Sequence, residues 1–151
     1  MPEPRCETED RTALKRRAAA GAVVNRVAVI TGSSGGLGRE VAAAFARAGF
    51  DLVLHYYRNA GAAEALASAV GPDARVSTFQ GDLGRQDNCE QLIAHARTEF
   101  GEVGVLVNNS GIALSALVHR FPAEDWENVL RTNLTSALYT TRAVLPGMYK
   151  R

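Results

Sequence analysis

The chain has 151 residues, the length of one ordinary domain, and hydrophobic residues make up 46% of it. Charged residues make up 22%, and the formal net charge is +1. This balance supports a buried core and excludes an intrinsically disordered chain. It also lacks the basic surplus expected of a nucleic-acid-binding surface, so we expect no nucleic-acid partner.

Cys6 and Cys89 lie far apart, and neither has a Cys or His partner at metal-ligand spacing. We therefore expect reduced thiols, no metal site and a cytoplasmic protein. No apolar run approaches the roughly 20 residues of a membrane span, so no membrane partner is expected. Residues 1–25 mix acidic with basic residues and lack the apolar region of a secretory signal. They predict a flexible leader before a domain that covers residues 26–151.

From Arg26 onward, short apolar runs alternate with longer segments of helical period. The runs predict strands at 27–30, from 52 onward, at 75–80 and at 103–107. The segments 37–48, 60–70 and 86–100 predict helices, and Pro122 suits the first turn of a fourth. The more polar run 75–80 favours a sheet edge. This alternation predicts an α/β fold, a Rossmann-type doubly wound parallel sheet in three α/β/α layers, incomplete after the fourth strand and its helix.

Two of the predicted helices have an apolar face that indicates which side is buried. In the first helix the expected inward residues are Leu37, Val41, Ala44, Phe45 and Ala48, with Gly49 as the capping residue. In the third they are Cys89, Leu92, Ile93 and Ala96.

The first predicted strand runs into a glycine-rich loop, Thr31-Gly32-Ser33-Ser34-Gly35-Gly36-Leu37-Gly38. Glycines allow a tight turn and the close approach of a pyrophosphate to a helix N-terminus, where unpaired N–H groups favour an anion. A glycine cluster alone also fits a plain tight turn. Its position between a buried strand and an amphipathic helix favours nucleotide binding.

Further polar residues follow the later strands. Asp82 comes after the third strand, at the carboxyl edge where open α/β sheets bind ligands, although a solvated turn aspartate is the alternative. Asn108 and Asn109 end the fourth strand and can satisfy buried backbone groups between neighbouring strands. Asn133 falls within the fourth helix, where its amide competes with backbone hydrogen bonds and loosens the helix.

These motifs together resemble the short-chain dehydrogenase/reductase family over residues 26–151. Thr31-Gly32-x-x-x-Gly36-x-Gly38 is similar to the family's cofactor loop, and Asp82 to the aspartate that contacts the adenine. Asn108-Asn109-Ser110-Gly111 resembles the Asn-Asn-Ala-Gly motif, with Ser110 in place of alanine. Asn133 resembles the asparagine that holds a water in a proton relay. The loop and second strand most resemble 3-oxoacyl-[acyl-carrier-protein] reductase-type ketoreductases.

The resemblance implies an NAD(P)-dependent oxidoreductase with a small carbonyl or alcohol substrate, and a homo-oligomer as a possible assembly. Asn133 is the one catalytic residue it implies in this chain. The cofactor-binding residues it implies are Thr31, Gly32, Ser34, Gly36, Leu37, Gly38, Tyr57, Arg58, Asp82, Leu83, Asn109, Ser110 and Gly111.

The end of the second strand indicates which nicotinamide cofactor is bound. NAD-binding folds place an acidic residue there for the ribose 2′-hydroxyl, but this strand ends in His55-Tyr56-Tyr57-Arg58. The nearby acid, Asp51, precedes the strand. A carboxylate would repel a 2′-phosphate whereas Arg58 can pair with one, so we expect NADP rather than NAD.

The family's catalytic serine and its Tyr-x-x-x-Lys have no counterpart in these 151 residues, because no tyrosine is followed four positions later by a lysine. The sequence therefore predicts the N-terminal cofactor-binding half of such an enzyme, inactive or nearly so by itself. A non-catalytic nucleotide-binding module and an inactive truncated product remain the alternatives.

Overall fold

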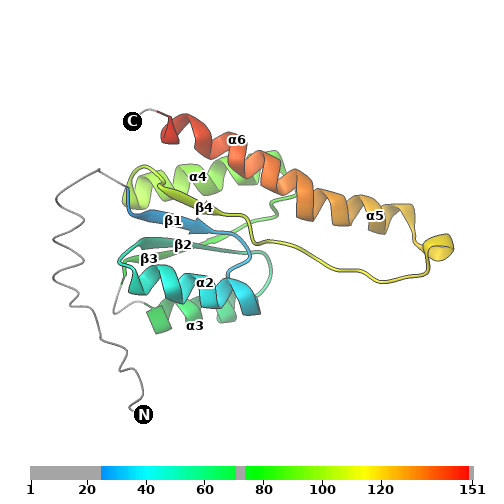
Figure 1. The fold of residues 1–151 in the computed structure, drawn as a ribbon, viewed down its shortest axis with the longest axis horizontal. Coiled ribbons are helices and arrows are strands. Elements are labelled where there is room, and N and C mark those ends of the chain that lie inside the picture. Colours follow the sequence, from blue (N-terminus) through cyan, green and yellow to red (C-terminus); the bar gives the residue numbers. More distant parts are fainter. Residues whose placement is uncertain (1–24, 71–73, 150–151) are drawn as a thin grey trace, which may run out of the picture.

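The computed structural model describes residues 25–70 and 74–149, which form one parallel sheet covered by helices (Figure 1). The predicted leader therefore lies outside the described residues except for Asn25, as does Cys6. The strands are β1 (Val27–Ile30), β2 (Asp51–Tyr56), β3 (Val76–Gln80) and β4 (Val105–Val107). Their order is β3-β2-β1-β4, and every pairing is parallel. The polar strand β3 lies at a sheet edge, as predicted.

Helices cover both faces of this sheet. The helices α2 (Gly36–Arg47) and α3 (Ala60–Val70) lie on one face, and α4 (Gln86–Phe100) and α6 (Ser136–Met148) lie on the other (Figure 1). The predicted Rossmann-type, three-layer α/β/α architecture is thus confirmed for the described residues. The helix boundaries of α3 and α4 match the prediction from sequence.

The alternation of side chains along the central strands divides the core in two. On one side, Val27, Val29 and Val53 pack with Leu92 and Ile93 of α4. On the other side, Ala28, Ile30, Leu52 and Leu54 pack against α2 and α3. A strand with both faces buried needs apolar residues at every position, and this explains the continuous run from Val27 to Ile30.

The predicted buried face of α2 was wrong in part. Leu37 is 72% exposed, and Ala44 and Ala48 are also exposed. The fully buried positions are instead Gly38, Ala42 and Ala46. These small residues stand four apart and let the helix lie close to the sheet, while the larger apolar residues fall to either side. The prediction for α4 is confirmed, because Cys89, Leu92, Ile93 and Ala96 are all buried.

The fourth strand is shorter than predicted, because Val103 and Gly104 precede the ladder. Val103 is nevertheless buried, and the Gly104 N–H donates to the Val27 carbonyl at 2.9 Å. Within the described residues β4 pairs with β1 alone and forms the second edge of the sheet.

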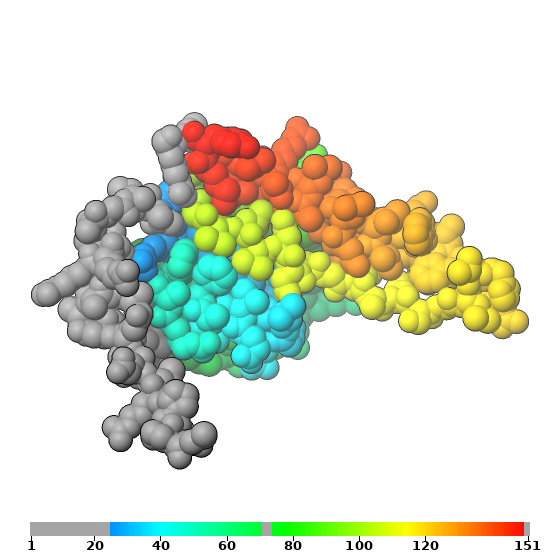
Figure 2. Space-filling model, in the orientation of Figure 1, coloured from blue at the N-terminus to red at the C-terminus, as the bar shows by residue number. Residues whose placement is uncertain are grey.

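After β4 the chain runs away from the sheet and returns in one long helix. This helix begins as α5 (Ala123–Leu130), passes through a π-helical segment (Arg131–Thr135) and continues as α6. Asn133 lies inside the π-helical segment, in agreement with the expected loosening of the helix at that residue. The segment before α5 and α5 itself project beyond the sheet (Figure 2). Within the described ranges, no helix combines the length and apolar character that a bilayer crossing needs.

Candidate dinucleotide-binding site

The strand order places a crevice at the carboxyl ends of β1 and β4. From β1 the chain moves outward through β2 to β3, and it then crosses back to place β4 on the other side of β1. The connections that leave β1 and β4 therefore diverge. Open α/β sheets bind their ligands at such a switch point.

The glycine loop joins β1 to α2 at this point. Gly32 has a φ of 63°, a left-handed conformation that favours glycine. The first turn of α2 has no side-chain cap, since Gly35 occupies the N-cap position. Its N-terminal amides and the positive end of the helix dipole are therefore suited to an anion.

Gly38 allows the start of α2 to lie against the loop. A Cβ at this residue would come within 2.6 Å of the Gly32 carbonyl oxygen and 2.8 Å of the Asn109 Nδ2 atom. Gly36 differs, because a Cβ there would meet nothing within 4 Å. Steric exclusion thus requires glycine at the third position of the motif but not at the second.

Thr31 and Asn109 fasten the loop to the end of β4. The Thr31 hydroxyl accepts the backbone N–H groups of Asn109 and Ser110, both at 2.9 Å. The Asn109 amide donates to the carbonyls of Thr31 and Gly32 at 2.9 and 3.0 Å. Asn109 therefore satisfies backbone groups between neighbouring strands, as predicted from the sequence.

Asn108 does not do so, and that prediction was wrong. Successive residues at a strand end point to opposite sides, so Asn108 is directed toward α6. Its Oδ1 accepts the Thr140 hydroxyl at 2.7 Å, and its Nδ2 donates to Thr141 at 3.2 Å.

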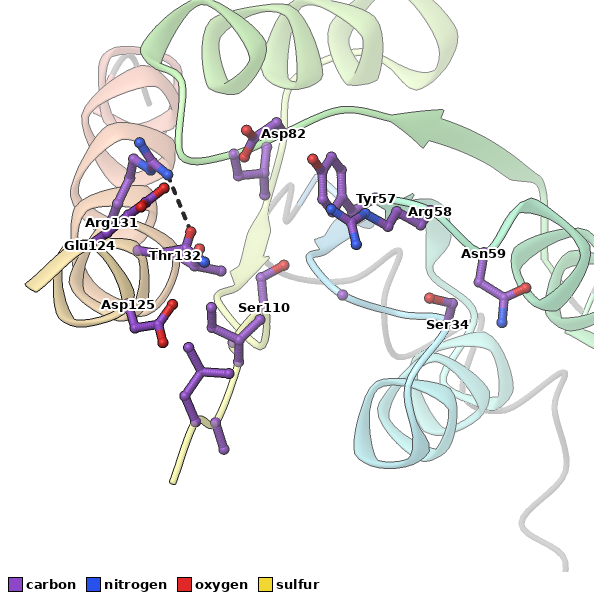
Figure 3. Close-up of a pocket in the computed structure, with 17 residues that line it drawn as sticks. Ser34, Tyr57, Arg58, Asn59, Asp82, Ser110, Glu124, Asp125, Arg131 and Thr132 are labelled. Atoms are coloured by element: carbon purple, nitrogen blue, oxygen red, sulfur yellow. Dashed lines mark hydrogen bonds between the residues drawn. The ribbon is translucent and has the colours of Figure 1, made fainter. Parts of the chain in front are cut away.

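A cavity of about 860 Å³ opens in front of the glycine loop (Figure 3). Of the predicted cofactor residues, it is lined by Gly32, Ser34, Tyr57, Arg58, Asp82, Leu83, Ser110 and Gly111. Thr31, Asn109 and Gly38 lie behind the loop and support it. Gly36 and Leu37 stand at the start of α2, outside the cavity lining.

Asp82 lies above the cavity between the ends of β3 and β4 (Figure 3). Its Oδ1 accepts the Gly84 N–H at 2.9 Å, which makes a tight local turn. The other carboxylate oxygen makes no hydrogen bond to any residue that the structure describes. Asp82 thus combines the turn role with an oxygen that is available to a ligand.

Arg58 follows β2 and stacks on its neighbour. Its guanidinium carbon lies 4.8 Å from the centre of the Tyr57 ring, and both side chains face the cavity (Figure 3). No acidic residue in the described ranges pairs with Arg58. Asp51 lies at the opposite end of β2, as expected, and forms an ion pair with Arg75.

Ser110 carries the one buried side-chain polar atom without a hydrogen-bond partner among the described residues. Its hydroxyl oxygen would be 3.1 Å from a Cβ on Gly32, so it lies against the glycine loop at the cavity wall. Buried hydroxyls are normally hydrogen-bonded, and a ligand in the cavity would remove this deficit.

Asn133 lies beside the same cavity but is occupied by a backbone contact. Its Oδ1 accepts the Ile112 N–H at 2.8 Å, and its Nδ2 donates to the Ile112 carbonyl at 2.9 Å. The side chain therefore holds the segment after Gly111, which forms one wall of the cavity. Its participation in a proton relay stays a prediction.

The sequence analysis missed the opposite wall and one buried residue. Glu124, Asp125, Asn128, Arg131 and Thr132 line the cavity from the long helix. No motif marks them, and only the return of the chain brings them to the site. His55, expected to be a partly buried strand-end residue, is only 3% exposed and bonds to the glycine loop.

The geometry can now be compared with known proteins. The sequence model of the short chain dehydrogenase family matches residues 26–151. The chain belongs to this family. Family members bind nicotinamide cofactors, in agreement with the glycine loop at the switch point.

Relatives of this short-chain dehydrogenase chain include characterised enzymes. It is 36% identical over 126 residues to D-beta-hydroxybutyrate dehydrogenase of Cupriavidus necator, covering 83% of this chain and 49% of the relative. It is 34% identical over 131 residues to 3-oxoacyl-[acyl-carrier-protein] reductase of Synechocystis sp., covering 86% and 53%. The chain thus spans about half the length of the curated relatives it matches.

Solved structures give the same result. A short-chain dehydrogenase/reductase from Brucella melitensis, described as a glucose/ribitol dehydrogenase, superposes with a TM-score of 0.77 at 31% sequence identity. The match covers 82% of this short-chain dehydrogenase chain and 52% of the Brucella chain.

Proposed function

We propose that this chain is the dinucleotide-binding part of an NADP-preferring short-chain dehydrogenase that interconverts a ketone and an alcohol. The observation that carries the proposal is the shared cavity. The uncapped start of α2, the carboxylate of Asp82 and the guanidinium of Arg58 come from three different strand ends and meet around one space. An anionic dinucleotide needs this combination of groups.

The residues present fit such a cofactor. A volume of about 860 Å³ lies within the range of small-molecule and cofactor sites. The left-handed Gly32 leaves the loop without a side chain where a pyrophosphate would approach. The unpartnered Ser110 hydroxyl at the cavity wall offers a further hydrogen bond.

Within this site the expected contacts follow from charge. The amides at the start of α2 would bind the pyrophosphate, and Asp82 with Leu83 would bind the adenine end. Arg58 would pair with the 2′-phosphate, which favours NADP because no acidic residue stands at the end of β2. When bound, the nicotinamide donates or accepts the hydride. The chain's own residues bind and orient it.

For the substrate, we propose a 3-oxoacyl or 3-hydroxyacyl compound. The names of both relatives above describe enzymes of this chemistry, one a β-hydroxybutyrate dehydrogenase and the other a 3-oxoacyl reductase. Asn133 is the catalytic-relay residue that this proposal assigns to the chain, and it would act by holding a water near the cavity.

By itself the chain is expected to bind cofactor without turnover. The 151 residues contain no Tyr-x-x-x-Lys, and loss of a positioned general acid/base costs on the order of 10² to 10⁴ in rate. Loss of a donor that polarises the carbonyl costs a further factor of about 10² to 10³. This absence favours a second candidate function, a nucleotide-binding module without catalysis of its own.

Calorimetric titration of the purified chain with NADP⁺ and with NAD⁺ tests the proposal. We expect saturable binding of both, with NADP⁺ the tighter ligand. A parallel reductase assay with NADPH and acetoacetyl-CoA should show no turnover above the protein-free rate. If neither dinucleotide binds at millimolar concentration, the proposed function is wrong. Robust turnover would instead contradict the assignment of a chain without its own acid/base.

A further inference from the structure

His55 makes an unusual set of contacts for a residue that does not line the cavity. It is the last buried residue of β2, with 3% of its surface exposed. Its Nδ1 accepts the backbone N–H of Gly32 at 3.1 Å, and its Nε2 lies 2.9 Å from the Gly81 carbonyl oxygen. One imidazole therefore joins the glycine loop to the residue that precedes Asp82.

These two contacts determine the state of the ring. A carbonyl oxygen only accepts, so Nε2 carries the proton, and an N–H only donates, so Nδ1 is bare. His55 is thus neutral, in the Nε2–H tautomer. Burial lowers the pKa of His55, with the Gly81 hydrogen bond and the Asp82 charge acting in the opposite direction, which agrees with a neutral ring.

The backbone of His55 strengthens the same connection. Its carbonyl oxygen accepts both the Ser33 N–H and the Ser33 hydroxyl, each at 3.0 Å. Three donors of the glycine loop therefore end on one residue of β2. The Gly32 N–H is directed inward by this contact, at the residue whose φ is left-handed. The remaining amides, toward α2, are those left for a ligand.

We propose that His55 is a positioning residue for the dinucleotide: its imidazole ties the phosphate-binding glycine loop to the turn that carries Asp82. The pyrophosphate and adenine ends of the site lie on different strands, and His55 holds these two ends in a fixed relation. The inference rests on the proposed function for its ligand, but the ring contacts are testable without one.

Three substitutions separate the two contacts. His55→Asn keeps an oxygen near the Nδ1 position and retains an acceptor for Gly32. His55→Gln extends to the Nε2 position and retains a donor for Gly81. His55→Leu removes both. A matched control is His95→Leu, which removes a partly buried histidine that bonds Ser77 on β3, away from the cavity.

We expect His55→Leu to weaken NADP⁺ binding about ten- to hundredfold, because a buried N–H and a carbonyl lose their partners. His55→Asn should recover most of this loss and His55→Gln a part of it, while His95→Leu should bind like the unchanged protein. If His55→Leu binds NADP⁺ as tightly as the unchanged protein, or if Asn gives no more recovery than Leu, the proposal is overturned.

A measurement on the ligand-free chain covers the case in which His55→Leu does not fold. Long-range ¹H–¹⁵N correlation spectra report the ring tautomer at neutral pH. We expect a protonated Nε2 and a bare Nδ1 for His55, with a Gly32 amide protected from exchange. A protonated Nδ1, or a rapidly exchanging Gly32 amide, would refute the inference even if NADP⁺ binds. Failure of NADP⁺ to bind the unchanged protein would instead refute the proposed function.

Discussion

The hydroxyl oxygen of Thr31 accepts the backbone N–H of Asn109 at 2.9 Å, across the boundary between β1 and β4. The same oxygen accepts the Ser110 N–H at 2.9 Å and donates to the Val107 carbonyl at 3.3 Å. One side chain thus satisfies three backbone groups where the two strands separate. The shape of the cavity wall at Ser110 depends on this contact.

Thr31→Val tests the contribution of that hydroxyl, because it keeps the shape of the side chain and removes the oxygen. Two buried N–H groups would then lack an acceptor, and each unsatisfied group costs about 1–3 kcal/mol. We expect the free energy of unfolding to fall by about 2–4 kcal/mol in urea denaturation. Thr31→Ser, which keeps the hydroxyl, should lose about 1 kcal/mol. Equal losses in the two variants would contradict the role of the hydrogen bonds.

Gly38→Ala should disturb the glycine loop. The new methyl group would lie 2.6 Å from the Gly32 carbonyl oxygen and 2.8 Å from the Ser33 Cα, both backbone atoms that cannot turn aside. Overpacking of this kind costs about 1–3 kcal/mol of stability, and we expect NADP⁺ affinity to fall with it. Thermal unfolding and calorimetric titration measure the two effects.

Gly36→Ala is the control for stability. A Cβ there meets nothing within 4 Å, and Gly36 begins α2, where alanine is the better helix former. We expect its midpoint of thermal unfolding to equal or exceed that of the unchanged protein. A destabilisation as large as that of Gly38→Ala would show that glycine flexibility, and not steric exclusion, is what the loop requires.

The fold and the glycine loop could be predicted from the sequence because both depend on local patterns. The apolar run from Val27 to Ile30, the helical period of 86–100 and the glycine spacing each arise from neighbouring residues. The buried face of α2 could not be predicted as well. Alanines at 42 and 46 and larger residues at 41 and 45 have similar periodicity, and only the distance from helix to sheet selects the small ones.

The parts of the site that were missed depend on contacts between distant segments. His55 meets Gly32 and Gly81, which lie 23 and 26 residues away, and nothing near His55 in the sequence indicates either partner. Arg131 and Asn128 reach the cavity only because the long helix returns over the ends of β3 and β4. Asn109 was predictable because its motif is local, although its partners are distant.

Arg58→Ala should change cofactor preference. Arg58 has no acidic partner among the described residues, so its charge is available to a 2′-phosphate. Hydrogen bonds to charged groups contribute about 1.5–3 kcal/mol, so NADP⁺ affinity should fall about ten- to hundredfold while NAD⁺ affinity changes less than about threefold. Calorimetric titration with both dinucleotides measures the ratio.

Arg47→Ala is the matched control for Arg58. Arg47 lies in the last turn of α2, at the end away from the cavity, and removes the same charge from the chain. Its NADP⁺ affinity should remain close to that of the unchanged protein. Were NADP⁺ and NAD⁺ affinities to fall equally in Arg58→Ala, the assignment of Arg58 to the 2′-phosphate would be wrong.

Acid should destabilise the chain through His55. Burial lowers its pKa below the ordinary value of 6.5, so the unfolded chain binds a proton more readily than the folded one. The stability that this provides is therefore complete above about pH 6.5 and declines as the pH falls toward the lowered folded-state pKa. Asp82, whose negative charge raises the pKa of His55, limits the decline.

Urea denaturation at several pH values between 5 and 8 measures this effect. The unfolding free energy of the unchanged protein should decrease more steeply with acid than that of His55→Asn, which carries no titrating ring. The two other histidines, His95 and His119, and all acidic residues are common to both proteins, so the difference isolates His55. Parallel curves for the two proteins would show that His55 is not buried in its neutral form.

Asn133→Ala should free the segment after Gly111 without unfolding the chain. The Asn133 side chain makes two solvent-exposed hydrogen bonds to Ile112, each expected to contribute about 1 kcal/mol. Their loss should raise hydrogen exchange at the Ile112 amide about ten- to thirtyfold, with little change in global stability. Asn133→Asp keeps the Oδ1 acceptor of the Ile112 N–H and should show a smaller increase. Asn128→Ala, one turn earlier on the same helix, should leave Ile112 unaffected. If exchange at Ile112 is unchanged in Asn133→Ala, the cavity wall is held by other contacts, and the asparagine side chain is free for the water that the proposed relay requires.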